Sequence, residues 1–136
     1  MNLNSNKNPK ITIITVVKNN EKYLEENIKS LINQTYQNYE HIIVDGLSTD
    51  KTMDIITRYK NKIHKIISER DNGLYDAINK GIQNASGDII GILNSDDYFY
   101  KDALNIVRKY FESFPDIDFL FGTVIKHKIL HGYKPW

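Results

Sequence analysis

Short apolar runs alternate with amphipathic segments along most of the chain. Residues 11–17 are β-branched and almost wholly apolar, which is typical of a parallel strand covered on both faces. In residues 21–33 leucine and isoleucine recur at helical spacing, and Asn20 is the expected N-cap. The pattern therefore begins with a strand and a crossover helix.

The same alternation continues through the rest of the sequence. Strands that alternate with helices of this length predict a parallel sheet, because parallel neighbours need a crossover connection. We therefore predict an α/β fold built as one layered domain. The further predicted strands are residues 41–45, 63–68, 88–94 and 118–125, and the further helices are residues 51–60, 75–85 and 102–114.

The composition fits one folded domain. A length of 136 residues leaves room for a single core, and 40% hydrophobic with 26% charged residues is ordinary for a globular protein. The net charge of +1 provides no field to hold a polyanion, so we expect no nucleic-acid partner. Without cysteine, any metal must be bound by oxygen or imidazole.

The beginning of the chain carries no recognisable targeting signal. Residues 1–10 are rich in asparagine and have no apolar core of a signal peptide, so we expect a disordered lead followed by one domain over residues 11–136. No apolar run reaches the roughly 20 residues that span a bilayer. Together with the lack of cysteine, this predicts a cytoplasmic protein.

Acidic side chains gather where the predicted strands end. In an open parallel sheet, ligands bind outside the carboxyl ends of the strands. Asp45 and Gly46 end one strand, and Asp96 and Asp97 follow another. Adjacent carboxylates repel one another unless a cation or a proton relieves them, and Mg²⁺ is typically held by one or two carboxylates plus phosphates. The sequence therefore predicts a divalent-cation site at this edge.

Other polar residues have structural explanations. Asp50 follows Ser48 and Thr49 and is expected to stabilise the amino end of the helix at 51–60. His127 and His131 have a metal-ligand spacing, but the surrounding β-pattern favours a structural or solvated role. The chain has no G-x-S-x-G elbow, P-loop or G-x-G-x-x-G motif, which disfavours hydrolases, kinases and nicotinamide enzymes.

Four blocks of sequence point to a known family. In chain order they read ITIITVVKNNE, SLINQTYQNYEHIIVDGLSTD, SERDNGLYDAINKG and SGDIIGILNSDD. Together they resemble the amino-terminal half of family 2 glycosyltransferases, and the match covers residues 11–122. The resemblance implies a GT-A fold, a Rossmann-like and mostly parallel sheet flanked by helices that binds a nucleotide sugar.

The resemblance also implies roles for residues at the strand ends. The donor would be a nucleoside diphosphate sugar, with UDP the expected nucleotide, and a D-x-D-type motif would bind Mn²⁺ or Mg²⁺. Val16, Val17 and Glu21 are expected to line the base and ribose pocket, Asp45 to contact the nucleoside, Asp71 and Gly73 to lie near the diphosphate or donor sugar, and Asp96 and Asp97 to form the D-x-D equivalent, with Asp97 as the direct metal ligand.

Three features depart from the family pattern. Ser95 replaces the first acid of a strict D-x-D motif, so metal affinity is expected to rest on Asp97 together with phosphate oxygens. Gly46 follows Asp45 where family members often carry a second acid, which bears on base selectivity. Family catalytic domains are longer than this chain, so we expect the acceptor half and its general base beyond Trp136 and assign no catalytic base here.

Three functional hypotheses remain open at this stage. By resemblance, the protein transfers a sugar from its nucleotide donor to a glycan or lipid-linked acceptor with inversion, as in polysaccharide or cell-envelope biosynthesis. A second hypothesis is a noncatalytic nucleotide-sugar-binding fragment that needs a missing C-terminal segment. A third is a receiver-like domain phosphorylated on Asp45, which leaves Asp96 and Asp97 unexplained.

Two surface properties are also expected. Without an acceptor half, the sheet edge at residues 119–125 would be partly uncovered, which favours self-association. The inner face of the membrane is a further expected location, reached through peripheral association.

Overall fold

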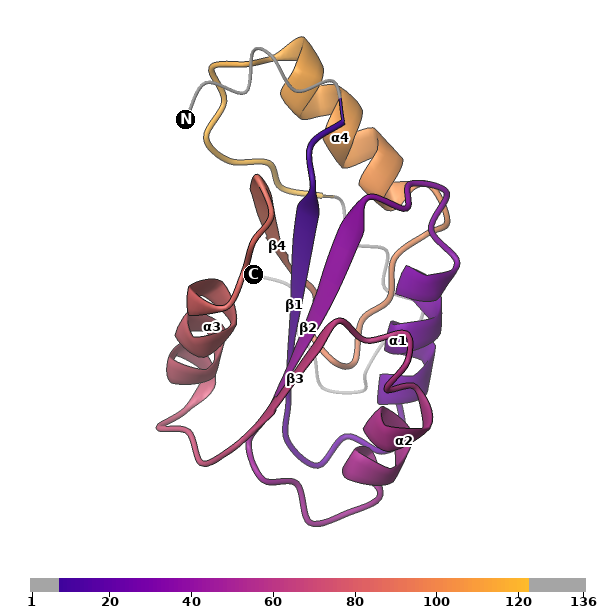
Figure 1. Cartoon of the computed structure of the whole chain (residues 1–136), viewed down its shortest axis with the longest axis vertical. Helices are drawn as coiled ribbons and strands as arrows, with labels where there is room; N and C mark the ends of the chain where they lie inside the picture. The colour runs from indigo at the N-terminus through magenta and orange to yellow at the C-terminus, as the bar shows by residue number, and fades with distance from the viewer. Residues whose placement is uncertain (1–7, 123–136) are drawn as a thin grey trace, which may run out of the picture.

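The chain forms a parallel sheet with helices on both faces (Figure 1). This computed structural model describes residues 8–122; residues 1–7 and 123–136, including His127 and His131, lie outside the described part. The sheet has four strands in the order β3-β2-β1-β4, and every neighbouring pair is parallel. The elements are β1 (Ile11–Val17), α1 (Leu24–Ile32), β2 (Tyr39–Asp45), α2 (Thr52–Arg58), β3 (Lys65–Ser68), α3 (Leu74–Gln83), β4 (Ile89–Ile92) and α4 (Ala103–Ser113).

Side chains of β1 alternate between two apolar layers. Ile13 and Val17 face the side that α1, α2 and α4 cover, whereas Ile14 faces α3 on the other side. Because successive side chains of a strand point to opposite faces, a continuous apolar run can supply both layers. The prediction of an α/β sheet covered on both faces is confirmed.

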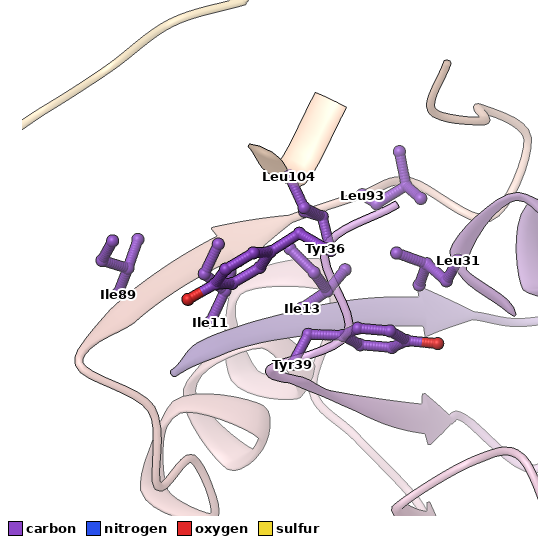
Figure 2. Close-up of a cluster of buried hydrophobic side chains, with 8 residues drawn as sticks. All are labelled: Ile11, Ile13, Leu31, Tyr36, Tyr39, Ile89, Leu93 and Leu104. Atoms are coloured by element: carbon purple, nitrogen blue, oxygen red, sulfur yellow. The ribbon is translucent and has the colours of Figure 1, made fainter. Parts of the chain in front are cut away.

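The layer beneath α4 joins three elements that are far apart in the sequence. Figure 2 shows Ile11 and Ile13 of β1 beside Leu31 of α1 and Leu104 of α4. Each of these side chains is at most 2% exposed. Full burial of such a side chain contributes about 1.5–3 kcal/mol to the stability of the fold. This apolar layer therefore holds α4 and the segment that leads into it against the sheet.

Close packing of α3 on the sheet depends on Gly81. A Cβ at this position would overlap the side chain of Ile14 in β1. The glycine therefore lets the helix backbone approach the central strand. None of the helices within residues 8–122 has the length and apolar character needed to cross a bilayer.

One predicted element is wrong in its described part. Residues 118–122, expected to begin a strand at 118–125, form no strand, and residues 123–125 lie outside the described residues. Phe119 and Phe121 are 81% and 91% exposed, and no strand in the described part pairs with this segment. An apolar, β-prone sequence forms a strand only where a neighbouring strand supplies hydrogen bonds.

The first helix begins later than predicted. It starts at Leu24 rather than at residue 21, and Asn20 does not act as its side-chain cap. The side-chain amide of Asn20 instead donates to the hydroxyl of Ser95, at 2.9 Å. A tertiary contact therefore replaces the local cap that the sequence predicts.

The third strand is also shorter than predicted. It begins at Lys65 rather than at residue 63, because Ile63 belongs to the turn after α2 and donates its N–H to the carbonyl of Tyr59. The remaining predicted boundaries agree with the structure to within about two residues, the usual uncertainty of element ends.

Residues 8–10 differ from the predicted disordered lead. The hydroxyl of Tyr36 lies 2.6 Å from the carbonyl oxygen of Pro9, and the N–H of Lys10 donates to the carboxylate of Asp88 at 2.9 Å. These contacts fasten the segment to the sheet before β1 begins.

Glu40 ties the amino ends of β1 and β2 to the turn before β4. Its side chain accepts hydrogen bonds from the hydroxyls of Thr12 and Ser86, at 2.6 and 2.8 Å, and pairs with Lys10 at 2.9 Å. Burial raises the pKa of Glu40, but these donors outweigh that effect and lower the pKa from 4.5 to about 2.

Replacement of Glu40 should change the response of the fold to acid. Because the pKa is lower in the folded chain, ionised Glu40 stabilises the fold above its unfolded pKa, and this contribution is lost as the pH falls from 4.5 toward 2. We expect Glu40→Gln to reduce the free energy of unfolding at neutral pH by about 1–3 kcal/mol and to flatten its decline in that acid range. Urea denaturation across this range measures both, with the exposed Glu26→Gln as control; identical acid profiles for the two variants would contradict the assignment.

Leu47, in the loop after β2, offers a test of backbone strain. Its φ is 60° and its side chain is 51% exposed, and this left-handed conformation costs a non-glycine residue about 1–2 kcal/mol. Replacement by glycine would remove this cost, but glycine also has more conformational freedom in the unfolded chain, which offsets part of the benefit. Leu47→Gly should therefore raise the free energy of unfolding by up to about 1 kcal/mol. Chemical denaturation measures the change. Leu47→Ala keeps the Cβ and should show no gain; an equal gain would assign the effect to the apolar side chain.

Candidate functional site

The carboxyl ends of three neighbouring strands lie in one row. Val17 of β1 is in register with Asp45 of β2, which is in register with Ser68 of β3. Since β4 runs parallel to β1, its following segment also leaves the sheet on this side. The loops that carry the predicted site residues therefore converge at one edge, where ligands bind in open parallel sheets.

Asp45 is fully buried at this edge, with no exposed surface. Its carboxylate accepts hydrogen bonds from the hydroxyl of Ser48 and, at 2.7 Å, from the hydroxyl of Ser68. The backbone N–H of Ser48 also donates to it. A carboxylate held in this way keeps a fixed orientation.

Gly46 allows Asp71 to lie beside the end of β2. A Cβ at Gly46 would overlap Oδ2 of Asp71 and would also meet the side chain of Lys18, at 3.4 Å. Oδ1 of Asp71 accepts the N–H of Gly73 at 3.0 Å, and the φ of 112° at Gly73 favours glycine there. The space that a second acid at residue 46 would need is thus occupied by a carboxylate from the next loop.

Asn19 joins the loops that follow β1 and β2. Its N–H donates to the hydroxyl of Ser48 at 2.8 Å, and its side-chain oxygen accepts the N–H of Thr49 at 2.7 Å. Asn19 has a φ of 51°, a left-handed conformation that asparagine tolerates better than most residues. The two loops therefore form one hydrogen-bonded unit over Asp45.

Glu21 and Asp50 connect the same two loops farther from the strand ends. The side chain of Glu21 accepts the N–H of Lys51 at 3.1 Å, and Asp50 accepts the N–H groups of Glu21 and Thr52, at 3.2 and 2.9 Å. Hydrogen bonds from Thr52 hold the pKa of the Asp50 carboxyl below its usual value. The predicted role of Asp50 at the amino end of the second helix is confirmed, and Glu21 is positioned by its backbone contacts.

Asp96 and Asp97 lie in an exposed turn after β4. The N–H of Asp97 donates to the carbonyl of Asn94 at 3.0 Å, which closes the turn. The hydroxyl of Ser95, where a strict motif has its first acid, accepts a hydrogen bond from Asn20. Both acids are thus exposed on a turn whose Ser95 side chain is held by a residue from the loop after β1.

The donor set of this turn fits a divalent cation that is bound together with phosphate. Within residues 8–122, no group of three or more His, Asp or Glu side chains is arranged to hold a metal by itself. Mg²⁺ is commonly bound by one or two carboxylates, with water and phosphate oxygens as its other ligands. Asp97 and Asp96 match that arrangement in number and chemistry.

The two valines predicted to line one pocket point to opposite faces of β1. Val17 is 2% exposed and packs with Leu24 and Ile43 beneath α1 and α2. Val16 is partly buried in the layer that contains Ala77 of α3. The structure therefore places both residues at the carboxyl end of β1 but does not bring their side chains together.

A separate cavity of about 530 Å³ lies between α1 and the segment after β4. None of the predicted site residues lines it, so the acids at the strand ends occupy a different part of the surface. Its lining residues are Glu26, Lys29, Ser30, Asn33, Tyr98, Phe99 and Lys101.

Sequence reasoning missed several polar residues that support the acids. Ser68 donates a hydrogen bond to Asp45 from the neighbouring strand. In the sequence, only its position at the end of a predicted strand points to this role. Asn27 is fully buried in α1 between the apolar positions Leu24 and Leu31. A polar residue inside the apolar stripe of a helix is unusual, and this pattern could have marked Asn27 for attention.

The sequence was compared with protein families and with individual proteins. The sequence model of glycosyl transferase family 2 matches residues 12–134. An uncharacterized glycosyltransferase of Rickettsia conorii is 38% identical over 121 residues, which cover 88% of this chain and 20% of that protein. TuaG of Bacillus subtilis, whose name assigns it to teichuronic acid biosynthesis, is 36% identical over 103 residues, covering 74% of this chain and 41% of that protein.

Solved structures of transferases share the fold. S. aureus TarS in complex with UDP-GlcNAc superimposes with a TM-score of 0.72 and 28% identity, over 76% of this chain and 31% of that one. The mannosyltransferase PcManGT of Pyrobaculum calidifontis, in complex with GDP-Man and Mn²⁺, gives a TM-score of 0.68 and 27% identity, over 74% of this chain and 32% of that one.

The chain spans less than half the length of each of these four proteins. The match to the family model, over residues 12–134, nevertheless includes nearly all of the sheet, the loops at the carboxyl ends of its strands and the turn after β4. Both the fold and the family expected from the sequence blocks are confirmed: the chain belongs to glycosyl transferase family 2 and has the GT-A fold.

Proposed function

We propose that the chain forms the donor-binding part of a metal-dependent, inverting glycosyltransferase that uses a UDP-sugar. The observation that carries the proposal is the convergence of the loops bearing Asp45, Asp71 and Asp97 at the carboxyl edge of a parallel sheet. The acceptor would be a glycan or a lipid-linked saccharide in cell-envelope polysaccharide synthesis. The name of B. subtilis TuaG supports that setting.

In this proposal the buried and exposed acids have different tasks. Asp45 would contact the nucleoside, with the hydroxyls of Ser48 and Ser68 fixed on its carboxylate. Asp71 and Gly73, joined by a hydrogen bond, would lie near the diphosphate or donor sugar. The remaining proposed contacts to the base and ribose come from Val16 and Glu21 at the strand end and loop of β1, and Val17, whose side chain is buried beneath α1 and α2, would support this strand end from within the core.

Asp97, assisted by Asp96, would hold the divalent ion. Bound there, Mn²⁺ or Mg²⁺ would neutralise the charge that develops on the departing nucleoside diphosphate. The Mn²⁺ in the PcManGT complex supports this cofactor. The exposed carboxylates of the turn leave room for the phosphate oxygens that would complete the coordination. We assign no general base among residues 8–122.

The identity of the base is open to direct measurement. The UDP-GlcNAc bound to TarS favours a uridine nucleotide, whereas GDP-Man is bound to PcManGT. Calorimetric titration of the chain with UDP and with GDP in Mn²⁺ separates the two, and tighter binding of GDP would overturn the choice of UDP.

Removal of one carboxylate should abolish the contribution of the metal to donor binding. We expect Mn²⁺ to strengthen UDP binding to the unaltered chain and Asp97→Asn to reduce that gain by about 10-fold or more, because a neutral amide is a poor ligand for a hard cation. Isothermal titration calorimetry with and without Mn²⁺ measures the gain.

The control for this experiment is Asp116→Asn, an equal change of charge at an exposed acid after α4. It should leave the metal-dependent gain unchanged. Equal losses in both variants would indicate a general charge effect, and absence of UDP binding to the unaltered chain would overturn the proposed donor site.

Turnover requires its own experiment, since a noncatalytic binding fragment would also bind UDP. Slow hydrolysis of a UDP-sugar by the chain in Mn²⁺, with water in place of an acceptor, would release UDP. Such release would contradict the hypothesis of a noncatalytic fragment. Binding without any release would support it. The cytoplasmic or membrane-surface location, peripheral membrane association and self-association stay predictions.

A further inference from the structure

The turn that carries Asp96 and Asp97 rests on a buried amide of α1. Nδ2 of Asn27 donates to the carbonyl of Asn94 at 2.8 Å and to the carbonyl of Asp97 at 3.0 Å. Asn27 has no exposed surface. One side chain therefore holds the first and the last carbonyl of the four-residue turn, from an element about 70 residues earlier in the chain.

We propose that Asn27 is a positioning residue, which sets the placement of Asp97 for the metal and so determines metal-dependent binding of the nucleotide. This inference rests on the function proposed above. Metal affinity depends on the groups that orient the ligands, and loss of such an orienting group typically lowers the metal affinity about 10–100-fold. A site with only one or two protein carboxylates should be especially sensitive, because few ligands share the task.

The oxygen of the Asn27 amide faces a buried contact on β1. Its Oδ1 accepts the hydroxyl of Thr15 at 3.3 Å, and Thr15 Oγ1 lies 2.9 Å from Nε2 of His41. Thr15 and His41 are at most 1% exposed. Since the single hydroxyl proton of Thr15 is directed to Asn27, Nε2 of His41 supplies the proton of the other bond.

The alternative orientation of the amide would be unfavourable. It would place the side-chain oxygen of Asn27 against the carbonyl oxygens of Asn94 and Asp97, and three acceptors would then face one another without a donor. The two carbonyls therefore select the orientation with the NH₂ group toward the turn, and the hydroxyl of Thr15 on β1 satisfies the remaining oxygen of the amide.

A second amide holds the turn from its outer side. Nδ2 of Asn20 donates to the hydroxyl of Ser95 at 2.9 Å. Within the turn itself, Asn94 Nδ2 lies 3.4 Å from Oδ2 of Asp97. The turn is therefore held through its backbone by Asn27 and through a side chain by Asn20, while Asp96 and Asp97 stay exposed.

Gln34, two residues after the end of the same helix, provides a matched control. It is 3% exposed, its Nε2 donates to the carbonyl of Tyr100 at 2.8 Å, and its Oε1 accepts the N–H of Leu104 at 3.0 Å. It therefore also uses a buried amide to hold the segment after β4. Because it holds the start of α4 rather than the turn, its loss should destabilise the fold without moving Asp97.

The test compares Asn27→Leu with Gln34→Leu in the complete 136-residue chain. UDP binding is measured by calorimetry with and without Mn²⁺, and thermal unfolding is measured in parallel. We expect both variants to unfold at lower temperature, but only Asn27→Leu to lose about 10-fold or more of the Mn²⁺-dependent gain in affinity, with metal-free UDP binding retained. A gain kept within about twofold in Asn27→Leu, or lost equally in both variants, would overturn the proposal.

Two further measurements cover the case in which Asn27→Leu does not fold. Asn27→Ser keeps a polar side chain with one hydroxyl donor, but this side chain is too short to reach both carbonyls, so the variant should show the same selective loss. In the unaltered chain, NMR signals of the Asn27 side-chain NH₂ should shift when Mg²⁺ and UDP are added together. Signals that stay fixed while the backbone N–H of Asp97 shifts would count against coupling of the two residues.

The outcomes for the two proposals are distinct. If the unaltered chain shows no Mn²⁺-dependent binding of UDP, the proposed donor site fails and this inference fails with it. If the unaltered chain shows that binding and Asn27→Leu shows it equally, the donor site stands and only the positioning role of Asn27 is rejected.

Discussion

Parallel pairing of β1 with both of its neighbours is the constraint on which the rest of this structure depends. Because β1 lies between β2 and β4, every strand must be followed by a connection that returns along one face of the sheet. The carboxyl ends then meet at a single edge, and the loops after them come together although they are separated by tens of residues. The register of Val17, Asp45 and Ser68 in one row is the direct expression of this constraint.

The edge combines fixed polar groups with exposed ones. Asp45 is held by two serine hydroxyls and Asn27 holds two carbonyls, and both side chains are completely buried. Among residues 8–122, every buried side-chain nitrogen or oxygen has a hydrogen-bond partner. Asp96 and Asp97, in contrast, are exposed on a turn whose backbone is restrained. Such an arrangement keeps the ligating groups free while it limits the motions that would misplace them.

Departures from the family pattern gain a physical meaning from the packing. Gly46, read from the sequence as the loss of a second acid, is the position against which Asp71 of the next loop packs. Ser95, read as the loss of a metal ligand, accepts a hydrogen bond from Asn20. In both cases the substituted residue makes a contact with a distant loop. Comparison along the sequence alone shows only what is missing at such positions, because the group that makes the contact lies elsewhere in the chain.

The periodicity of the sequence predicted the four strands and four helices found in residues 8–122 and their parallel arrangement, since alternating β-branched runs and amphipathic segments have few ways to bury their apolar faces. It also predicted a further strand at residues 118–125. Strand-end acids and the sequence blocks then indicated the edge of the sheet and the family. Only the tertiary structure decided that residues 118–122 form no strand, that Asn20 binds Ser95 instead of capping a helix, and that Asn27 holds the turn of Asp97. These outcomes depend on which distant groups packing brings within hydrogen-bond distance, and local propensity carries no information about such partners.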